Sequence, residues 1–323
     1  MSNLVKKIRT DAGDLQIDYN ALANLPALNT MFSNPNLLIN GDFQINQYNV
    51  LTSTPTVFAN GKYIIDRWQT ASSNQQYSIH EENNMKYMRI TAANNSISML
   101  LIRQYVEATN SLKNAMKNNS MTISMKVRAN KKSAYHYSTN AIKEVGTDWS
   151  IITCNYSYEE YFDNSKNALK VYAGIKPIDI LTNTTATFAT GDYVDIAWVK
   201  LEFGSVATRF SPRLVSEELL LCQRYYNYTN CRMLMTVYKA DIADGTYYHP
   251  VTMRVNPTVT VHSIKYYEVD KQQFIEPASF VKSDKYFDDQ YTMFVLTKNA
   301  SDTMVIGNCT NAWIDVTFDA EIY

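Results

Sequence analysis

The chain has 323 residues, of which 46% are hydrophobic, so it can form two or three domains with cores of their own. Its formal net charge of −1 argues against nucleic-acid binding, which calls for a basic surface. The sequence contains neither an apolar run long enough to span a membrane nor a signal-peptide pattern. We therefore expect that the protein assembles in the cytoplasm and does not insert into a membrane.

The first 35 residues differ in pattern from the rest. Apolar residues from Val5 to Pro26 alternate irregularly with polar ones, and such a segment cannot bury much surface alone. Segments of this kind become ordered against a partner or another copy of the chain. We therefore predict that residues 1–35 form an attachment and oligomerisation segment.

Strand patterns begin at Asn36. Met121–Ala129 alternates apolar and polar residues, which predicts a strand that is buried on one side and wet on the other. A second strand is predicted at Tyr193–Phe203, and a helix is predicted around Leu100–Met116. In the second strand we expect one face to carry Asp195, Ala197, Val199, Leu201 and Phe203, and the other to carry Val194, Ile196, Trp198, Lys200 and Glu202. These elements predict a β-sandwich over residues 36–213.

A short helix is predicted next. Ser216 is a candidate N-cap, and Glu217 and Glu218 would lie in the first turn, where carboxylates favour the positive helix end. We expect the helix to end near Tyr226 and to form a connecting segment over residues 214–230.

Further strand patterns follow, separated by proline and glycine, and they predict a second, smaller β-sandwich over residues 231–323. In the last strand Ile314, Val316 and Phe318 share the expected core face, with Trp313 and Asp315 on the other. The predicted fold class is mainly β, with a β-sandwich, a connecting helix and a smaller C-terminal β-sandwich.

Residue patterns typical of enzymes are missing. The nine glycines are never close together, so no phosphate-binding loop is predicted, and no GxSxG sequence occurs. The histidines are scattered, at His80, His136, His249 and His262. Neighbouring carboxylates such as Glu159/Glu160 and Asp288/Asp289 point to opposite faces of a strand, and Glu217/Glu218 suit a helix start. We therefore predict that the chain is not an enzyme and has no cofactor.

Two carboxylates are weak candidates for calcium ligands. Asp42 and Asp195 lie near the two ends of the predicted sandwich, but calcium needs six to eight oxygen ligands. The alternative is that Asp42 caps a turn and Asp195 lies at an exposed strand end. The four cysteines, at 154, 222, 231 and 309, form no CxxC pair, so we expect free, buried thiols.

Aromatic side chains provide the candidates for ligand binding, because sugar rings stack on exposed aromatic faces. Trp198 and Trp313 lie on partly polar strand faces and could instead contact another subunit or domain. Trp68 and Trp149 are predicted core residues. The other candidates, for which ordinary cross-strand packing is the alternative, are Tyr247, Tyr248, His249, Tyr266 and Tyr267.

Four stretches resemble modules of bacteriophage tail-fibre and receptor-binding proteins. They are NLLINGDFQINQ (36–47) with DRW (66–68), VKLEFGSVATRFSPR (199–213) and EELLLCQRYY (217–226). IDYNALANLP (17–26) and MRVNPTVTV (253–261) are similar to further segments of such proteins. The resemblance implies a carbohydrate-binding-module-like jelly roll in a homotrimeric virion protein. It also implies that residues 1–35 bind other virion proteins and that the C-terminal domain reaches the host surface, where the aromatic candidates lead us to expect a glycan as the ligand.

Within that resemblance the motif residues look structural. Asn40 and Gly41 would shape a turn, Arg67 and Trp68 would pack, and Gln223 would lie on the connecting helix. The resemblance transfers no ligand-binding residues, so the aromatic candidates come from the residues alone. A structural fibre, collar or head-decoration subunit without a ligand is the alternative function, and a receptor polysaccharide hydrolase is a third.

Overall fold

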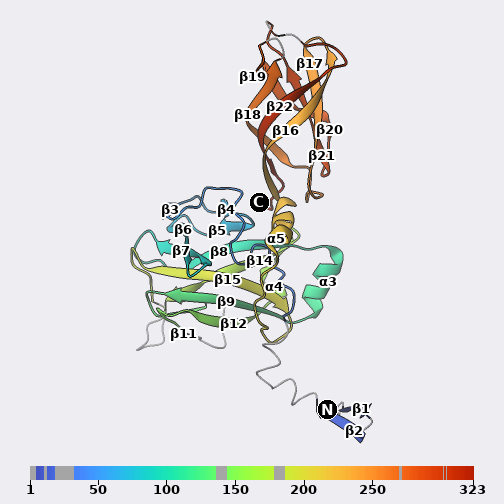
Figure 1. The fold of residues 1–323 in the computed structure, drawn as a ribbon. Coiled ribbons are helices and arrows are strands. Elements are labelled where there is room, and N and C mark those ends of the chain that lie inside the picture. Colours follow the sequence, from blue (N-terminus) through green and yellow to red (C-terminus); the bar gives the residue numbers. More distant parts are fainter. Residues whose placement is uncertain are drawn as a thin grey trace. The chain divides into compact units, whose positions relative to one another are not determined.

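The computed structural model describes residues 5–10, 13–18, 33–135, 144–177, 186–268, 271–300, 302 and 304–323. The fold is mainly β, as predicted (Figure 1). Two compact units share the chain. Unit 1 comprises residues 1–42, 53–60 and 71–213, and unit 2 comprises residues 43–52, 61–70 and 214–323. The chain therefore passes from unit 1 into unit 2 and back twice before it enters unit 2 for the last time.

The N-terminal segment is described only as a hairpin of β1 (Val5–Thr10) and β2 (Gly13–Asp18). The rest of the predicted attachment segment up to residue 32, including most of IDYNALANLP, lies outside the described residues, as does His136.

Unit 1 is a jelly-roll sandwich of antiparallel sheets, drawn as two layers in Figure 1. One sheet has the strand order β12-β9-β15-β7-β6-β3, and the other contains β11-β10-β14-β8 with β13 beside β14. The first sheet consists of β3 (Thr56–Val57), β6 (Gln75–Glu82), β7 (Met85–Ala92), β9 (Met121–Ala129), β12 (Ser150–Tyr156) and β15 (Tyr193–Phe203). The second contains β8 (Leu100–Glu107), β10 (Ser133–Tyr135), β11 (Glu144–Val145), β13 (Phe162–Asp163) and β14 (Ala168–Pro177).

Strand β9 has the predicted buried face, but its other face is drier than expected. Ile123, Met125 and Val127 are buried as predicted, and Thr122 and Ser124 are buried too. The Thr122 hydroxyl donates to the carbonyl of Gly204 at 2.7 Å. The end of β9 is therefore covered by the chain segment that follows β15.

Strand β15 has the predicted bounds but a different division of faces. Its register with β9 shifts between Ile196 and Trp198, which makes Ala197 the extra residue of a β-bulge. Val194 and Ile196 therefore share the core face with Val199 and Leu201. A strict two-residue alternation had assigned these two pairs to opposite faces, because it did not allow for the bulge.

The helix predicted around Leu100–Met116 is wrong over its first half. Leu100–Glu107 is strand β8, which pairs with β14 along its whole length. A short apolar run of this kind suits a buried strand as well as a helix, so periodicity alone did not separate them. Helix α3 is Asn110–Asn118, and the Thr109 hydroxyl accepts from the amide of Leu112 at 3.3 Å as an N-cap.

Unit 2 contains a seven-stranded antiparallel sheet with the order β19-β18-β22-β16-β17-β21-β20. The strands are β16 (Tyr226–Lys239), β17 (Ile242–Tyr248), β18 (Thr258–Glu268), β19 (Gln273–Ile275), β20 (Ser279–Phe287), β21 (Tyr291–Thr297) and β22 (Cys309–Asp319). Both ends of the sheet contribute to one core, since Ile275 of β19 and Phe280 of β20 pack against the same buried cluster. The sheet is therefore curled into a sandwich.

The last strand fits its predicted pattern. Ile314, Val316 and Phe318 are completely buried, whereas Trp313 is 42% exposed. Phe318 lies 6.2 Å from the ring of Phe294 across the core.

The connecting helix α5 is Val215–Gln223, and it begins and ends earlier than predicted. Leu214 is its N-cap and provides no side-chain hydrogen bond, so Ser216 is a helical residue and the predicted Ser216 cap is wrong. Glu217 and Glu218 lie in the first turn, as expected for carboxylates near the helix N-terminus. The helix stops before Tyr226 because that residue begins β16.

A buried ion pair joins distant parts of unit 2. The Arg67 guanidinium contacts the Glu321 carboxylate, 254 residues further along the chain, and both side chains are almost completely buried. The Arg67 Cζ atom lies 3.5 Å from the ring centroid of Tyr225. Burial raises the pKa of Glu321, and the charge of Arg67 opposes this shift. The DRW motif is thereby attached to the residues that follow β22 and to Tyr225 of the EELLLCQRYY motif.

Hydrogen bonds of residues near Arg67 attach this region to other segments of unit 2. Tyr63 of β4 (Tyr63–Ile65) and Gln69 of β5 (Trp68–Thr70) both donate to the carbonyl of Ile322, at 2.9 and 3.1 Å. The Asp66 carboxylate accepts from the amide and the side chain of Gln47, each at 2.5 Å. Burial raises the pKa of Asp66 to about 6.

We predict that Arg67→Met lowers the free energy of unfolding by about 3–5 kcal/mol, because Glu321 would be left buried without its counter-ion. Urea denaturation measures the loss. The double variant Arg67→Met/Glu321→Leu should recover part of it, since it removes both charges. Lys239→Met, which removes an exposed charge from β16, is the control and should change stability by less than about 0.5 kcal/mol. A loss below about 1 kcal/mol in Arg67→Met would contradict this role.

The pKa of Asp66 gives a pH-dependent prediction. Because the folded-state pKa is raised, protonation stabilises the fold below pH 4, and this contribution is lost as the pH rises to about 6. Wild-type stability should therefore fall across that window relative to Asp66→Asn, by up to about 3 kcal/mol. Paired urea titrations at pH 4 and pH 7 test this. Parallel stability profiles for the two proteins would show that Asp66 does not titrate as described.

Candidate functional site

The sequence motifs of unit 1 form a scaffold. The Asn36 side chain donates to the carbonyl of Val199 and accepts from the amides of Leu38 and Leu201, all at 3.0 Å. The Arg213 guanidinium donates to the carbonyls of Asn36 and Leu38. A Cβ atom on Gly41 would lie 2.5 Å from the carbonyl oxygen of Val199, so only glycine fits there. The motif residues therefore hold the first and last parts of the unit together.

Trp198 is stacked within its own unit. Its ring lies 4.7 Å from that of Phe210, with an angle of 8° between the planes. Nearby, the Lys200 ammonium donates to the Thr208 hydroxyl at 2.7 Å, and the Glu202 carboxylate accepts from the amide and hydroxyl of Thr208. The segment after β15 thus covers the outer face of that strand. Phe210 already occupies one face of the Trp198 ring, which reduces the area open to a sugar.

Asp195 lies between two arginines. Its carboxylate accepts from Arg89 at 2.7 and 2.9 Å and from Arg128 at 2.8 Å. Asp195 is completely buried, so the expected exposed strand end is wrong. Two guanidinium groups already neutralise this carboxylate and would repel a cation, so its surroundings do not fit calcium. Asp42 is half-buried and already interacts with another group of the protein. The residues that the structure describes contain no group of three or more metal-binding side chains.

The outer face of the unit 2 sheet carries Trp313. On β22, Trp313 lies directly between Arg232 of β16 and Lys265 of β18, which are its cross-strand neighbours. The Arg232 Cζ atom is 5.5 Å from the Trp313 ring centroid and 5.4 Å from that of Phe274. Leu234, two residues along β16, is 62% exposed. We call this surface the Trp313 face, and its members are Arg232, Leu234, Lys265, Tyr267, Phe274 and Trp313.

The other predicted candidates divide between surface and core. Tyr267 belongs to the Trp313 face and lies 5.4 Å from Phe274. Tyr248 is 73% exposed but lies on β17, beside Tyr291. Tyr266 is completely buried, and its hydroxyl donates to Asp302.

Tyr247 and His249 pack against the core. The Tyr247 ring stacks on Phe318 at 5.0 Å, and His249 contacts Phe318 edge-on at 4.6 Å. Burial lowers the pKa of His249 to about 4. With Tyr266, these side chains are not available to a ligand on the outer face of the sheet.

Sequence reasoning missed the partners of Trp313 and Asp195. Arg232, Lys265 and Phe274 flank Trp313 only because of the strand register, which no local pattern specifies.

Trp149 was predicted in the core but is half-buried, with the Arg128 Cζ atom 4.4 Å from its ring centroid. All four cysteines are free, but Cys222 alone is buried and Cys309 is exposed, so the prediction of buried thiols is wrong for three of them.

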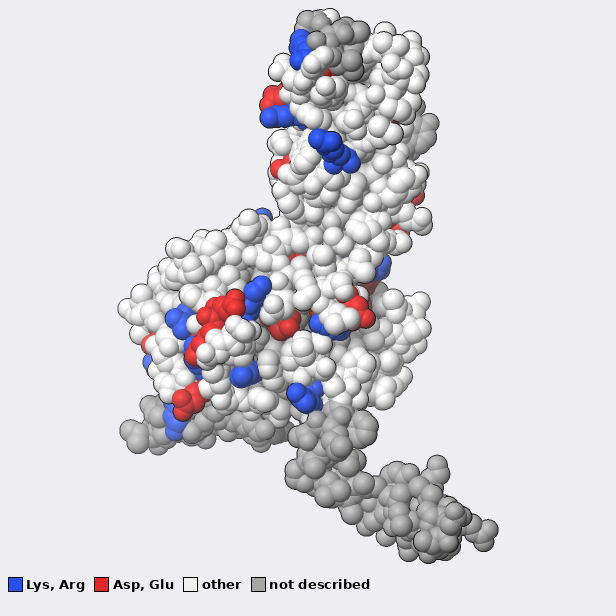
Figure 2. Space-filling model, in the orientation of Figure 1, with Lys and Arg blue, Asp and Glu red and all other residues white. Residues whose placement is uncertain are grey.

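Charge is unevenly distributed over the visible surface. Figure 2 shows acidic and basic side chains gathered over β6, β7, β9 and β15 of unit 1, while the visible face of unit 2 carries few charges. The ion pairs of Asp195 with Arg89 and of Arg128 with Glu82 belong to this part of unit 1. Among the described residues, no helix is both long and apolar enough to cross a bilayer.

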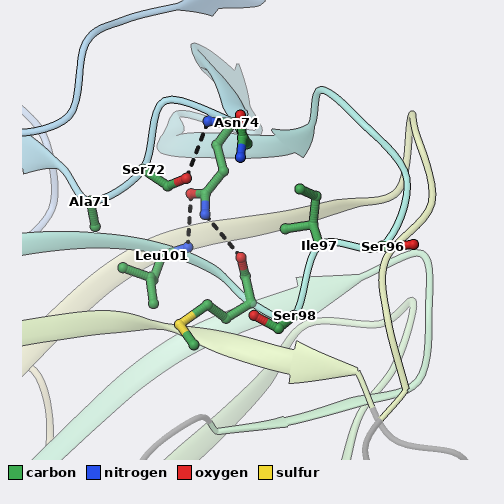
Figure 3. A pocket seen from close by; sticks show the side chains of 9 residues that line it. Ala71, Ser72, Asn74, Ser96, Ile97, Ser98 and Leu101 are labelled. Atoms are coloured by element: carbon green, nitrogen blue, oxygen red, sulfur yellow. Dashed lines mark hydrogen bonds between the residues drawn. The ribbon is translucent and has the colours of Figure 1, made fainter.

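One hollow of unit 1, of about 300 Å³, lies between the loops around Asn74 and Ile97 (Figure 3). The Gln75 side chain crosses it, donating to the carbonyl of Met99 at 2.9 Å and accepting from the amide of Leu101 at 3.2 Å. Its amide is therefore used to hold the two loops together. The hollow has no aromatic or charged lining residue.

Comparisons with known proteins do not identify a family. No family model and no curated protein matches the chain. Among solved structures, the tandem CBM22-1–CBM22-2 domain of Paenibacillus barcinonensis Xyn10C has a TM-score of 0.27 at 12% identity, covering 83% of this chain and 95% of that one. Discoidin II of Dictyostelium discoideum has a TM-score of 0.18 at 8% identity, covering 85% and 94%. A second, wild-type discoidin II structure has a TM-score of 0.18 at 10% identity, covering 98% and 99%. Similarity at these TM-scores is too low to support a function, so we infer function from the side chains of this chain.

The arginine pairs around Asp195 give a prediction about calcium. We expect the melting temperature to change by less than about 1 °C between buffer with EDTA and buffer with millimolar calcium, because no ligand set is available at Asp195 to bind the ion and stabilise the fold. Differential scanning calorimetry measures this. An increase of several degrees with calcium would instead place a cation site in the protein.

Proposed function

We propose that this protein is a virion fibre subunit that attaches to a glycan on the host surface by non-covalent binding. The sequence motifs support the fibre assignment through their resemblance to tail-fibre modules. The Trp313 face supports the binding assignment, and the partial exposure of Trp313 between two cations is the observation that carries it.

The chemistry of the Trp313 face suits a saccharide. The indole ring offers an apolar surface to the C–H groups of a sugar ring. Arg232 and Lys265 provide hydrogen-bond donors on both sides of it, and Phe274 of β19, the strand next to β18, adds a second aromatic ring to the face. Because these side chains stand on paired strands, their spacing is fixed before a ligand arrives, which limits the entropy cost of binding.

Assembly of several chains on one virion would compensate for a low glycan affinity of each single Trp313 face. Homotrimerisation, with residues 1–35 bound to other virion proteins, would place several copies of the Trp313 face on one particle, and avidity would multiply a weak single-site affinity.

A structural fibre, collar or head-decoration role remains the alternative, and the exposed Leu234 favours it, because apolar side chains also mark subunit interfaces. A polysaccharide hydrolase is the third candidate, and release of reducing sugars from host polysaccharide would establish it.

We predict that Trp313→Ala weakens binding to a bacterial surface polysaccharide by about tenfold or more, because the variant lacks the stacking surface. An array of such polysaccharides, probed with the full-length chain, identifies the glycan and compares the variants. Tyr248→Ala is the matched control, since it removes an exposed aromatic from another strand of the same unit and should bind normally.

Analytical ultracentrifugation of the same variants separates the two uses of this face. A Trp313→Ala protein that binds glycan normally but no longer forms the native oligomer would make the face a subunit interface and would contradict the proposal. So would unchanged binding together with an unchanged oligomer.

A further inference from the structure

We propose a second saccharide-binding site in unit 1, in a hollow of about 610 Å³ between helix α4 (Tyr158–Tyr161) and strand β14. It extends the proposed attachment function to a surface that no sequence motif marks. We call it the Tyr161 hollow, and the lining residues that matter here are Glu160, Tyr161, Asp163, Lys170 and Tyr172.

Two aromatic rings form a corner of the hollow. The rings of Tyr161 and Tyr172 are 6.5 Å apart, at 78° to each other, and both side chains are half-buried. Behind them, the buried Tyr156 lies 4.8 Å from Tyr161 and supports its ring. A pyranose ring can stack its C–H face on one tyrosine and place its edge against the other.

The polar groups of the hollow are placed for sugar hydroxyls. The Lys170 ammonium and the Asp163 carboxylate are 4.0 Å apart, which is longer than a direct hydrogen bond. A hydroxyl between them would accept from Lys170 and donate to Asp163. This combination of donor and acceptor is what a hydroxyl requires, and both side chains keep part of their surface exposed.

The corner and the polar pair are held in place without a ligand. The Tyr156 hydroxyl donates to the carbonyl of Lys170 at 2.7 Å and accepts from the amide of Tyr172 at 3.3 Å. The amide and hydroxyl of Ser165 donate to Asp163, at 3.0 and 2.6 Å, and these bonds lower the pKa of Asp163. The carboxylate is therefore ionised and fixed at neutral pH, and so remains an acceptor.

The charges indicate the class of saccharide. The lining contains one cation, Lys170, and two carboxylates, Glu160 and Asp163, and Glu160 also accepts from the Tyr161 hydroxyl at 2.6 Å. An acidic sugar would meet net negative charge there. We infer that the ligand is a neutral pyranoside, and a hollow of this volume has room for one or two sugar rings.

Saturation-transfer NMR on the full-length chain tests this site. The probes are methyl glucoside, methyl galactoside, methyl mannoside and methyl N-acetylglucosaminide, with glucuronic acid as the acidic comparison. Tyr161→Ala and Asp163→Asn should each weaken binding of at least one neutral glycoside about tenfold, while Lys176→Ala, further along the same strand, leaves it unchanged. Thermal melting establishes that each variant is folded, and Asp163→Asn removes a charge without changing side-chain volume.

Trp313→Ala separates this site from the Trp313 face. Neutral-glycoside binding that survives Trp313→Ala and is lost in both Tyr161→Ala and Asp163→Asn supports the Tyr161 hollow. Binding that is lost only in Trp313→Ala overturns the hollow and leaves the attachment function in place. Stronger binding of glucuronic acid, or no binding of any neutral probe, also overturns it.

Discussion

The buried contact between Arg67 and Glu321 is the interaction on which unit 2 depends. It connects a loop near the start of the chain to the final residues, and Tyr225 packs on the same guanidinium. Removing a charge from water is costly, so a buried arginine needs a counter-ion close by, which Glu321 provides. The charge of Arg67 in the DRW motif is therefore compensated only when the C-terminal segment folds against it. This requirement explains why residues 61–70 belong to the same unit as residues 214–323.

The same principle accounts for the motifs of unit 1. Asn36, Gly41 and Arg213 use their side chains, or the lack of one, to bind backbone groups of distant segments. Such residues fix the fold and are not available to a ligand. Under the proposed function, recognition uses side chains that the scaffold leaves uncovered, and we propose two such surfaces among the described residues, the Trp313 face and the Tyr161 hollow. These two proposed surfaces are on different units.

The sequence was most informative where burial follows a strict alternation. The core face of β22 could be predicted because a two-residue period directly reflects which of its side chains are buried, and the extent of the strand patterns predicted the bounds of β9 and β15 and the mainly β fold. It failed where one residue changes the pattern. The bulge at Ala197 moved Val194 and Ile196 to the core face, and the apolar run at Leu100 fitted a helix as well as a strand.

The candidate binding surface was less predictable than the fold. The exposure of Trp313 was foreseen, but its neighbours Arg232 and Lys265 depend on strand register, and the stacking of Phe210 on Trp198 depends on how a loop folds back.

The central claim is that recognition uses the exposed aromatic surface and not the motif scaffold. The indole N–H signals of the four tryptophans offer a direct test, because one titration of the isotope-labelled full-length chain with the glycan that it binds reports on all of them. We expect the Trp313 signal to shift in a saturable way while the signal of the completely buried Trp68 stays in place. A saturable shift at Trp68 or Trp198 with no change at Trp313 would contradict the claim and would assign binding to the scaffold.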